Sequence, residues 1–305
     1  MNAIISGADG FIGSKLVGEL LRHGSRVLAF DLAPTPRRLG LKEKNLQYVQ
    51  CSLEEIEKLE KIVTSGSYDV FYHFAWRGSM GAERGDYAIQ LENAKLAVRA
   101  MIEAKKIGCK KFVFASSIAE FETNQVVYLD GTKPDPHYLY GAGKAAAHEM
   151  CKPVANAIGI DLVWANITNA YGIGDLSDRF LNSTLKKIIH GQDLEFTSGN
   201  QNYDFAYIDD VVGAFRLLGE KGLANKTYII GSGEAKPLRA FLEEMIKELK
   251  PNGRVNFGNV PFTGTQAPLA NFSIDSLSRD CGYAPKTRFV QGVRLTFEWL
   301  KEQKV

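Results

Sequence analysis

The chain has 305 residues, of which 45% are hydrophobic and 24% are charged, and its formal net charge at pH 7 is +2. This length is typical of a globular protein with one large domain and a smaller second lobe. The nearly balanced charge gives no reason to expect a nucleic-acid or membrane partner.

The first half of the chain alternates short β patterns with helical patterns. Gly24 and Gly108 follow two of the helical segments and act as stop signals. Strict alternation predicts an α/β fold with a doubly wound parallel sheet of the Rossmann type, in which residues 1–165 form the first domain. We predict strands at residues 2–6, 26–30, 70–75, 111–115 and 161–165, and helices at residues 11–23, 53–63, 83–107 and 138–158.

A glycine motif separates the first predicted strand from the first predicted helix. The motif reads Gly7-Ala-Asp-Gly10-Phe-Ile-Gly13. Glycines at this place permit a tight turn and let backbone amides approach a pyrophosphate at the positive end of a helix. The position and spacing therefore predict that residues 1–165 bind a dinucleotide.

An acidic residue, Asp31, follows the second strand about 20 residues after the glycines. A carboxylate at this place accepts hydrogen bonds from the adenosine ribose and repels a 2′-phosphate. We therefore expect NAD(P) as the cofactor, with NAD favoured by Asp31. Arg37 and Arg38 follow closely and could compensate a 2′-phosphate, which moderates that preference.

Tyr140 and Lys144 lie four residues apart on a predicted helix, downstream of a strand that ends at Ser116 and Ser117. Residues at this spacing share a helix face. A cation about 4 Å from a phenol contributes on the order of 4 kcal/mol at an effective dielectric near 20, or roughly three pKa units. A phenol with so low a pKa can exchange a proton with a carbinol while a hydride moves, so we predict Ser117, Tyr140 and Lys144 as catalytic residues.

With these motifs, the chain resembles the extended short-chain dehydrogenase/reductases, the nucleotide-sugar epimerase/dehydratase group, over nearly its whole length. After about residue 166 the alternation loosens and glycines and prolines separate shorter elements, so we predict that residues 166–305 form mainly a smaller substrate-binding lobe, with some segments returning to the Rossmann sheet. The resemblance implies NAD(P), a nucleotide-sugar substrate, and a homodimer formed through the two long helices. The motifs that carry it are Gly7-Ala-Asp-Gly-Phe-Ile-Gly13, His73-Phe-Ala75, Asn93, Ser116-Ser117, Tyr140-Gly-Ala-Gly-Lys144, Asn169-Ala-Tyr-Gly172, Tyr203-Asp-Phe-Ala-Tyr-Ile-Asp-Asp210, Gly231-Ser-Gly-Glu234 and Cys281-Gly-Tyr-Ala-Pro-Lys-Thr287.

The resemblance also implies individual binding residues. The cofactor-binding set is Gly7, Gly10, Phe11, Ile12, Gly13, Asp31, Ser52, Leu53, Phe74, Ala75, Asn93 and Ile167. The substrate-binding set is Trp76, Asn169 and Tyr203. Ser52 stands where the family usually has Asp, which predicts a weaker contact with adenine. His73 is interpreted as a packing residue at the end of a strand, and His148 as an ordinary helix residue.

This chain departs from the family pattern at positions that concern the type of reaction and the binding of a diphosphate in the substrate. Related dehydratases carry two acids where this chain has Ile118 and Ala119, which argues against 4,6-dehydration. The family usually has an Arg at the place of Tyr203, and often one at the place of Asn166. Arg holds a diphosphate more strongly than a phenol does. Other cations could replace it, and the candidates are Arg179, Lys186 and Lys187.

Three functions are compatible with these residues. The first is a nucleotide-sugar 4-epimerase or 4-ketoreductase, the second a reductase of a non-nucleotide carbonyl, and the third a dinucleotide-binding protein without catalysis. No pair or cluster of the four cysteines has the spacing of metal ligands, so we expect no metal site. With no signal-peptide pattern and no apolar stretch long enough to span a bilayer, we expect a cytoplasmic protein.

Overall fold

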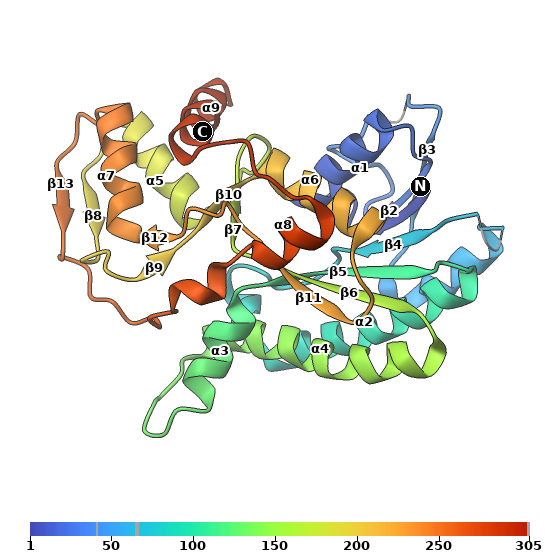
Figure 1. Cartoon of the computed structure of the whole chain (residues 1–305). Coiled ribbons are helices and arrows are strands. Elements are labelled where there is room, and N and C mark those ends of the chain that lie inside the picture. The colour runs from blue at the N-terminus through green and yellow to red at the C-terminus, as the bar shows by residue number, and fades with distance from the viewer. Residues whose placement is uncertain (41, 65–66, 304–305) are drawn as a thin grey trace. The chain divides into compact units, whose positions relative to one another are not determined.

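A computed structural model describes residues 1–40, 42–64 and 67–303 of the chain. The chain folds into two compact units (Figure 1). The first unit comprises Met1–Ile167, Val212–Ile229 and Ser276–Tyr283. The second comprises Thr168–Val211, Ile230–Asp275 and Ala284–Val305.

The first unit is built on a seven-stranded sheet in the order β11-β6-β5-β4-β1-β2-β3. Adjacent strands from β6 through β3 pair in parallel, which confirms the predicted doubly wound fold. Because parallel strands all end at one edge, the segments that follow them share that edge. The strands are β1 (Ala3–Ser6), β2 (Val27–Asp31), β3 (Leu46–Gln50), β4 (Val70–His73), β5 (Lys111–Ser117), β6 (Asp161–Ile167) and β11 (Lys226–Ile230).

Helices cover the sheet of the first unit, and α2 and α4 lie side by side against it (Figure 1). Buried alanines along both helices allow this close approach, and the core between helices and sheet is apolar and aromatic. The helices of this unit are α1 (Phe11–Arg22), α2 (Tyr87–Ile107), α3 (Ala119–Val127), α4 (Leu139–Ile158) and, apart from their first residues, α6 (Ile208–Lys221) and α8 (Asp275–Cys281), with short 3₁₀ segments η1 (Leu53–Lys61), η2 (Ala82–Gly85) and η3 (Pro136–Tyr138).

Two predicted helices differ from the structure. Where a helix over residues 53–63 is predicted, the 3₁₀ segment η1 covers Leu53–Lys61, because Glu55 leaves helical geometry and breaks the run. The helix predicted from residue 83 begins at Tyr87, since the Asp86 side chain caps it by accepting from the amides of Ala88 and Ile89. Strand β3 and helix α3 were not predicted: β3 is only half-buried and so has no apolar run for a sequence pattern to detect.

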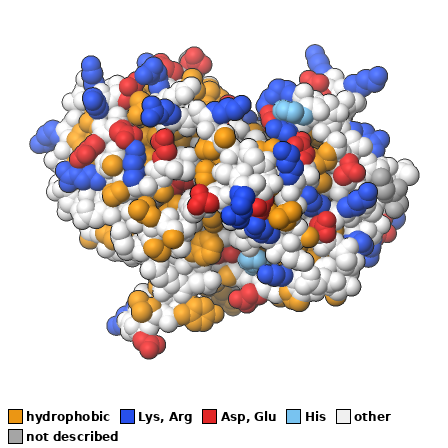
Figure 2. Space-filling view, in the orientation of Figure 1, with side chains coloured by type: hydrophobic (Ala, Val, Ile, Leu, Met, Phe, Trp, Pro, Cys, Tyr) orange, Lys and Arg blue, Asp and Glu red, His pale blue; other side chains and the backbone are white. Residues whose placement is uncertain are grey.

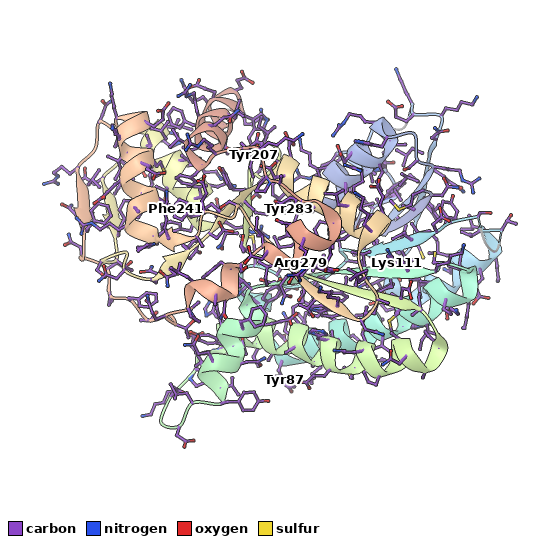
Figure 3. The ribbon with its side chains drawn as sticks, in the orientation of Figure 1. Tyr87, Lys111, Tyr207, Phe241, Arg279 and Tyr283 are labelled. Atoms are coloured by element: carbon purple, nitrogen blue, oxygen red, sulfur yellow. The ribbon has the colours of Figure 1, made fainter. Side chains whose placement is uncertain are left out.

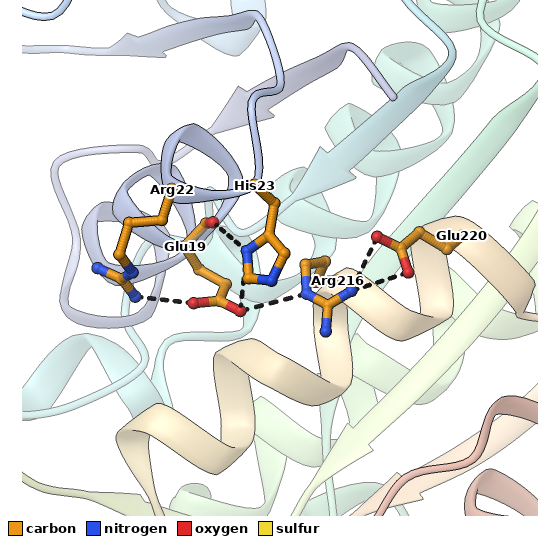
Figure 4. A network of polar contacts seen from close by, with 5 residues as sticks. All are labelled: Glu19, Arg22, His23, Arg216 and Glu220. Carbon is orange, nitrogen blue, oxygen red and sulfur yellow. Dashed lines mark hydrogen bonds and ion pairs between the residues drawn. The ribbon is translucent and has the colours of Figure 1, made fainter.

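Charged side chains join α1 to α6 in the first unit (Figure 4). Arg216 donates to Glu19 at 3.2 Å and to both oxygens of Glu220 at 2.9 Å. Glu19 also accepts from Arg22, and hydrogen bonds from the two arginines lower the pKa of Glu19 against the opposing effect of burial. This network holds the glycine-motif helix to a segment almost 200 residues later in the chain.

The described part of the second unit contains short two-stranded ladders and the helices α5, α7 and α9. β10 pairs in parallel with β7, β12 pairs antiparallel with β9, and β13 pairs in parallel with β8. On the face drawn in Figure 2, basic and acidic side chains are intermixed. The elements are β7 (Asn169–Tyr171), α5 (Phe180–Ile189), β8 (Leu194–Phe196), β9 (Asn202–Tyr203), β10 (Phe205–Tyr207), β12 (Lys236–Pro237), α7 (Leu238–Leu249), β13 (Val255–Phe257), η4 (Leu269–Phe272) and α9 (Phe289–Glu302).

No helix in the described part of the chain is long and apolar enough to cross a membrane.

Candidate active site

The glycine motif forms the tight turn between β1 and α1. Gly7 has a φ of +67°, and a Cβ built on it would lie 2.7 Å from the amide nitrogen of Ala75. A Cβ on Gly13 would lie 2.2 Å from the carbonyl oxygen of Gly7. Both positions therefore require glycine for packing, whereas a Cβ on Gly10 would meet only the Gly7 carbonyl oxygen, at 3.1 Å.

The turn presents the N-terminus of α1. Gly10 is the N-cap, so the amides of Phe11 and Ile12 lie in the first turn of the helix, where backbone N–H groups have no acceptor within the helix. The helix dipole adds positive potential at the same place. These features fit the pyrophosphate of a dinucleotide, as the sequence predicts.

Asp31, at the end of β2, binds the backbone of this turn. Its Oδ2 accepts from the Asp9 amide at 2.9 Å and its Oδ1 from the Leu32 amide at 2.7 Å. The Asp9 carboxylate in turn accepts from the amides of Arg37 and Arg38. The two aspartates thus tie the arginine segment to the glycine turn, a role of Asp9 that the motif alone did not indicate.

The other predicted cofactor residues follow neighbouring strands at the carboxyl edge of the sheet. Ser52 and Leu53 come shortly after β3, and Phe74 and Ala75 directly after β4. Ile167 ends β6, in register with Ser117 of β5. Parallel pairing therefore gathers these residues along one edge, where open α/β sheets bind ligands.

Asn93 is buried on α2, and its side chain holds the loop after β4. Its Oδ1 accepts from the Arg77 amide at 3.1 Å, and its Nδ2 donates to the Arg77 carbonyl at 2.8 Å. Trp76 in the same loop donates its indole N–H to Gln90 at 2.9 Å. Both contacts position the Trp76 ring beside the predicted catalytic pair.

Lys144 is buried on α4 and lies beside Tyr140, as their spacing predicts. Its Nζ donates to the Ala115 carbonyl at 2.9 Å. The same nitrogen lies 3.7 Å from the centroid of the Trp76 ring and 5.8 Å from that of the Tyr140 ring. The ammonium is therefore held by one carbonyl and by aromatic faces.

Burial lowers the pKa of Lys144 from 10.5 to about 7, and the negative charge of Glu120 opposes this effect. A free lysine would remain charged at neutral pH, whereas this one is close to losing its proton. The spacing of Tyr140 and Lys144 predicts a lysine that is always charged, but in its buried position Lys144 carries its charge only below about pH 7.

A second cation contacts the Tyr140 ring. The guanidinium carbon of Arg84 lies 4.2 Å from the ring centroid, and Arg84 donates to the Ser79 carbonyl at 3.0 Å. The Trp76 ring meets Tyr140 edge to face at 6.3 Å. Arg84 was missed by sequence reasoning because it lies 56 positions earlier in the chain, in the short segment η2, which carries no motif.

Ser117 ends β5, two residues after the carbonyl that binds Lys144. Its Oγ accepts from the Ala119 amide at 3.2 Å, and the Ile118 amide donates to the Ile167 carbonyl. The strand end and the start of α3 are thereby fixed. The predicted role of Ser117 toward a substrate oxygen remains a prediction.

The glycines between Tyr140 and Lys144 bring α4 close to its neighbours. A Cβ on Gly141 would lie 2.0 Å from Thr123 Oγ1 and 2.3 Å from the Ala119 carbonyl oxygen, both on α3. A Cβ on Gly143 would lie 2.9 Å from the Cβ of Gln90 on α2. The motif therefore combines the two residues that are predicted to be catalytic with two packing positions.

Asn169 and Tyr203 belong to the second unit. Asn169 donates its side-chain amide to the Asp204 carbonyl at 2.9 Å, and the Tyr203 ring packs on Phe205 at 5.0 Å. Asp204 is buried and accepts from Thr168 and Ser232. Burial raises the pKa of Asp204, while these hydrogen bonds counteract the shift.

His73 is buried at the end of β4. Its Nδ1 lies 3.0 Å from the Ser6 hydroxyl, and its ring stacks near Phe112 and Phe114. Burial, together with the charge of Lys144, lowers the pKa of His73 to about 3. The ring is therefore neutral at physiological pH, which agrees with its interpretation as a packing residue.

The four cysteines are buried free thiols, and burial raises the pKa of Cys109 and Cys151 to about 12. Within the described ranges, no group of three or more His, Cys, Asp or Glu side chains could hold a metal ion.

Comparison with known proteins agrees with this geometry. The model of the NAD dependent epimerase/dehydratase family matches residues 3–231. An uncharacterized UDP-glucose epimerase of Bacillus subtilis is 29% identical, covering 77% of this chain and 78% of its own. The GDP-mannose 3,5-epimerase of Arabidopsis thaliana is 27% identical, covering 98% of this chain and 82% of its own.

A solved structure shares the fold. UDP-glucose 4-epimerase of Thermotoga maritima, solved with UDP-glucose, superposes with a TM-score of 0.80 at 22% identity, covering 100% of each chain. The family match over residues 3–231 shows that the chain belongs to the NAD-dependent epimerase/dehydratase family, and with the relatives named above it shows an NAD(P)-dependent sugar-modifying enzyme of the short-chain dehydrogenase/reductase type.

Proposed function

We propose that the protein is a nucleotide-sugar 4-epimerase or 4-ketoreductase. The observation that best supports this proposal is the position of Lys144. Its Nζ donates to the Ala115 carbonyl near the end of β5 and lies 5.8 Å from the centroid of the Tyr140 ring. Ser117 ends the same strand. A proton-transferring phenol and a hydroxyl donor are thus held close to the edge where the glycine turn would place the cofactor.

In this proposal each of the three predicted catalytic residues has one role. Tyr140 takes a proton from the sugar hydroxyl, or returns it to the carbonyl oxygen. Lys144 in its ammonium form stabilises the phenolate, and Ser117 holds the same oxygen by a hydrogen bond. The glycine turn, Asp31 and the strand ends would hold the nicotinamide cofactor, which would supply or accept the hydride. Asp31 favours NAD, since its carboxylate would repel a 2′-phosphate.

Dehydration is not part of the proposal. Ile118 and Ala119 stand where related dehydratases have acids. The nearby acid Glu120 is only 4% exposed and accepts hydrogen bonds from Ser116 and Trp164. A carboxyl group engaged in this way has no free access to a sugar carbon.

Similar proteins support the proposal that the substrate carries a nucleotide, whereas two residues of this chain argue against it. The Thermotoga enzyme was solved with UDP-glucose. In this chain, however, Tyr203 and Asn166 replace the family arginines, and Asn166 is fully buried. Among the candidate replacement cations, Lys186 donates to Asp178 at 2.9 Å. These substitutions favour, as a second candidate, a reductase of a non-nucleotide carbonyl.

Calorimetry with UDP, dTDP, CDP and GDP separates the two candidates. A nucleotide-sugar enzyme binds at least one of these diphosphates. If none binds while NAD(P) does, the non-nucleotide reductase is the better assignment.

The catalytic role of Tyr140 is tested by Tyr140→Phe, with Tyr138→Phe as the matched control. We expect Tyr140→Phe to bind NAD(P) as the wild type does and to lose most turnover on a panel of sugar nucleotides, because it lacks the exchangeable proton. Turnover is followed by product analysis and by absorbance at 340 nm. Unchanged turnover would refute the mechanism, and no turnover in any variant would favour a non-catalytic dinucleotide-binding protein.

We also propose that the protein is a homodimer assembled through α2 and α4. Tyr87 and Leu91 on α2 and Met150 on α4 expose 69%, 59% and 42% of their surface. Tyr87 points outward at the start of α2 (Figure 3). Apolar side chains on two adjacent long helices are typical of an association surface.

A further inference from the structure

The strongest unassigned feature is the buried carboxyl group of Glu120 on α3. Its Oε1 accepts from the Ser116 hydroxyl and from the indole N–H of Trp164, the latter at 2.8 Å. Its Oε2 lies 3.3 Å from His148 Nδ1. An ionised carboxyl group only accepts hydrogen bonds, and two donors directed at one oxygen suit that form.

Stacked rings make the surroundings of Glu120 rigid. The Trp164 ring stacks on Phe114 at 3.9 Å with an interplanar angle of 4°, and on His148 at 4.2 Å with an angle of 7°. Phe114 also lies 4.7 Å from Lys144 Nζ. His148, which the sequence suggested to be an ordinary helix residue, is therefore part of a packed cluster.

Two residues that contact Glu120, Ser116 on β5 and His148 on α4, lie close to Lys144. On β5, Ser116 directly follows Ala115, whose carbonyl accepts from Lys144. On α4, His148 lies four residues after Lys144, on the same face of the helix. Glu120 is thus held between the strand and the helix that together position the lysine.

The buried ammonium group of Lys144 requires a negative charge nearby. Lys144 is 3% exposed, and its Nζ contacts the Ala115 carbonyl and the Trp76 and Phe114 rings, none of which carries a negative charge. Other charged or titratable groups near it include His73 on β4, which is neutral, the Tyr140 phenol, and, over the Tyr140 ring, the positive charge of Arg84. An ammonium buried without an opposite charge is strongly disfavoured. Glu120 supplies the opposing charge.

We propose that Glu120 is a positioning residue for Lys144: its buried carboxylate, fixed by Ser116, Trp164 and His148, keeps the lysine in the charged form that Tyr140 requires. This inference rests on the proposed function, in which the ammonium acts on the phenol. It assigns a role to an acid that lies outside the catalytic motif.

The test measures the protonation of Lys144 itself in protein without substrate. Lysine is labelled with ¹³C, and the Cε resonance absent from Lys144→Met is followed against pH. In Glu120→Gln we expect the titration midpoint of Lys144 to fall by on the order of one pH unit, because a negative charge that favours the ammonium is removed. Glu149→Gln, which neutralises an exposed acid on α4, should leave the midpoint unchanged.

The pH profile of turnover gives the second measurement. Activity on the high-pH side should fall at a lower pH in Glu120→Gln than in the wild type, whereas a merely structural defect would lower activity at every pH. Glu120→Asp, which keeps the charge, should restore most of the shift. An unchanged Lys144 midpoint in folded Glu120→Gln would overturn the inference.

If Glu120→Gln does not fold by circular dichroism, Glu120→Leu replaces it. This change also removes the buried negative charge and keeps a side chain of similar size, so the Lys144 midpoint should move in the same direction. No movement there would equally overturn the inference. Failure of the proposed function appears separately, as full turnover in Tyr140→Phe, because the lysine titration needs no catalysis.

Discussion

At the scale of single residues, the candidate site depends on a lysine held where lysine is least stable. Lys144 is buried, and burial lowers its pKa to about 7. The aromatic faces of Trp76 and Phe114 and the Ala115 carbonyl offset part of the lost hydration. Burial of a charged group is typical of functional sites, where groups with a shifted pKa are retained although they lower the stability of the fold.

This cost has a definite pH dependence. Below about pH 7 the lysine is charged in both the folded and the unfolded chain, so the wild type bears the full cost of the buried charge. Above 10.5 it is neutral in both states. Between these values the unfolded chain binds more protons, so the wild type gains stability as pH rises.

We therefore expect Lys144→Met to unfold at a higher temperature than the wild type at pH 6, by on the order of a few degrees, and to be inactive. The difference should shrink as pH approaches 10. Thermal unfolding at several pH values measures this, with Lys152→Met, an exposed lysine of α4, as the control. A gap that does not narrow with pH would contradict the assigned cause.

At the scale of elements, the close packing of α4 decides where the reactive residues lie. Gly141 lets α4 touch α3, and Gly143 lets it touch α2. The same contact brings α3, and with it Glu120, against the strand end that binds Lys144. A helix with larger residues at these places would still present Tyr140 and Lys144 on one face, but at a different distance from β5.

Gly141→Ala should destabilise the protein by on the order of 1–3 kcal/mol, because overpacking forces helices apart. Gly213→Ala is the matched control, since Gly213 also lies in a helix, α6, and a Cβ there meets nothing within 4 Å. That change should be neutral or stabilising, by up to about 1 kcal/mol. Denaturant unfolding compares the two, and equal effects would refute the packing role of Gly141.

At the scale of the whole molecule, the first unit contains the glycine turn and the Tyr140/Lys144 pair, while the second contains Asn169 and Tyr203. The chain passes between the units several times, so the division in space does not follow the division in sequence. The proposed dimer would use only the first unit, through α2 and α4.

For the dimer, Leu91→Glu should shift the protein from two chains to one, because a charge would be buried at the interface. Leu223→Glu changes an equally apolar, 50% exposed residue outside α2 and α4 and should leave the mass unchanged. Light scattering after size-exclusion chromatography gives the mass. A wild type that is monomeric at micromolar concentration would reject the proposal.

The sequence by itself determined the features that depend on local spacing. The glycine turn, the positions of five strands along the chain, the shared face of Tyr140 and Lys144 and the helix ends at Gly24 and Gly108 follow from backbone geometry over a few residues. The half-buried strand β3 and the kink at Glu55 were missed, because neither has a strong local pattern.

Only the tertiary structure decided the surroundings of the reactive pair. Trp76, Arg84 and Glu120 come from separate parts of the chain, and no spacing rule connects them to Lys144. Burial also sets the pKa of the lysine, and burial is a property of the packed whole. Local periodicity fixes which side chains share an element, whereas the electrostatics of a site depend on every segment folded around it.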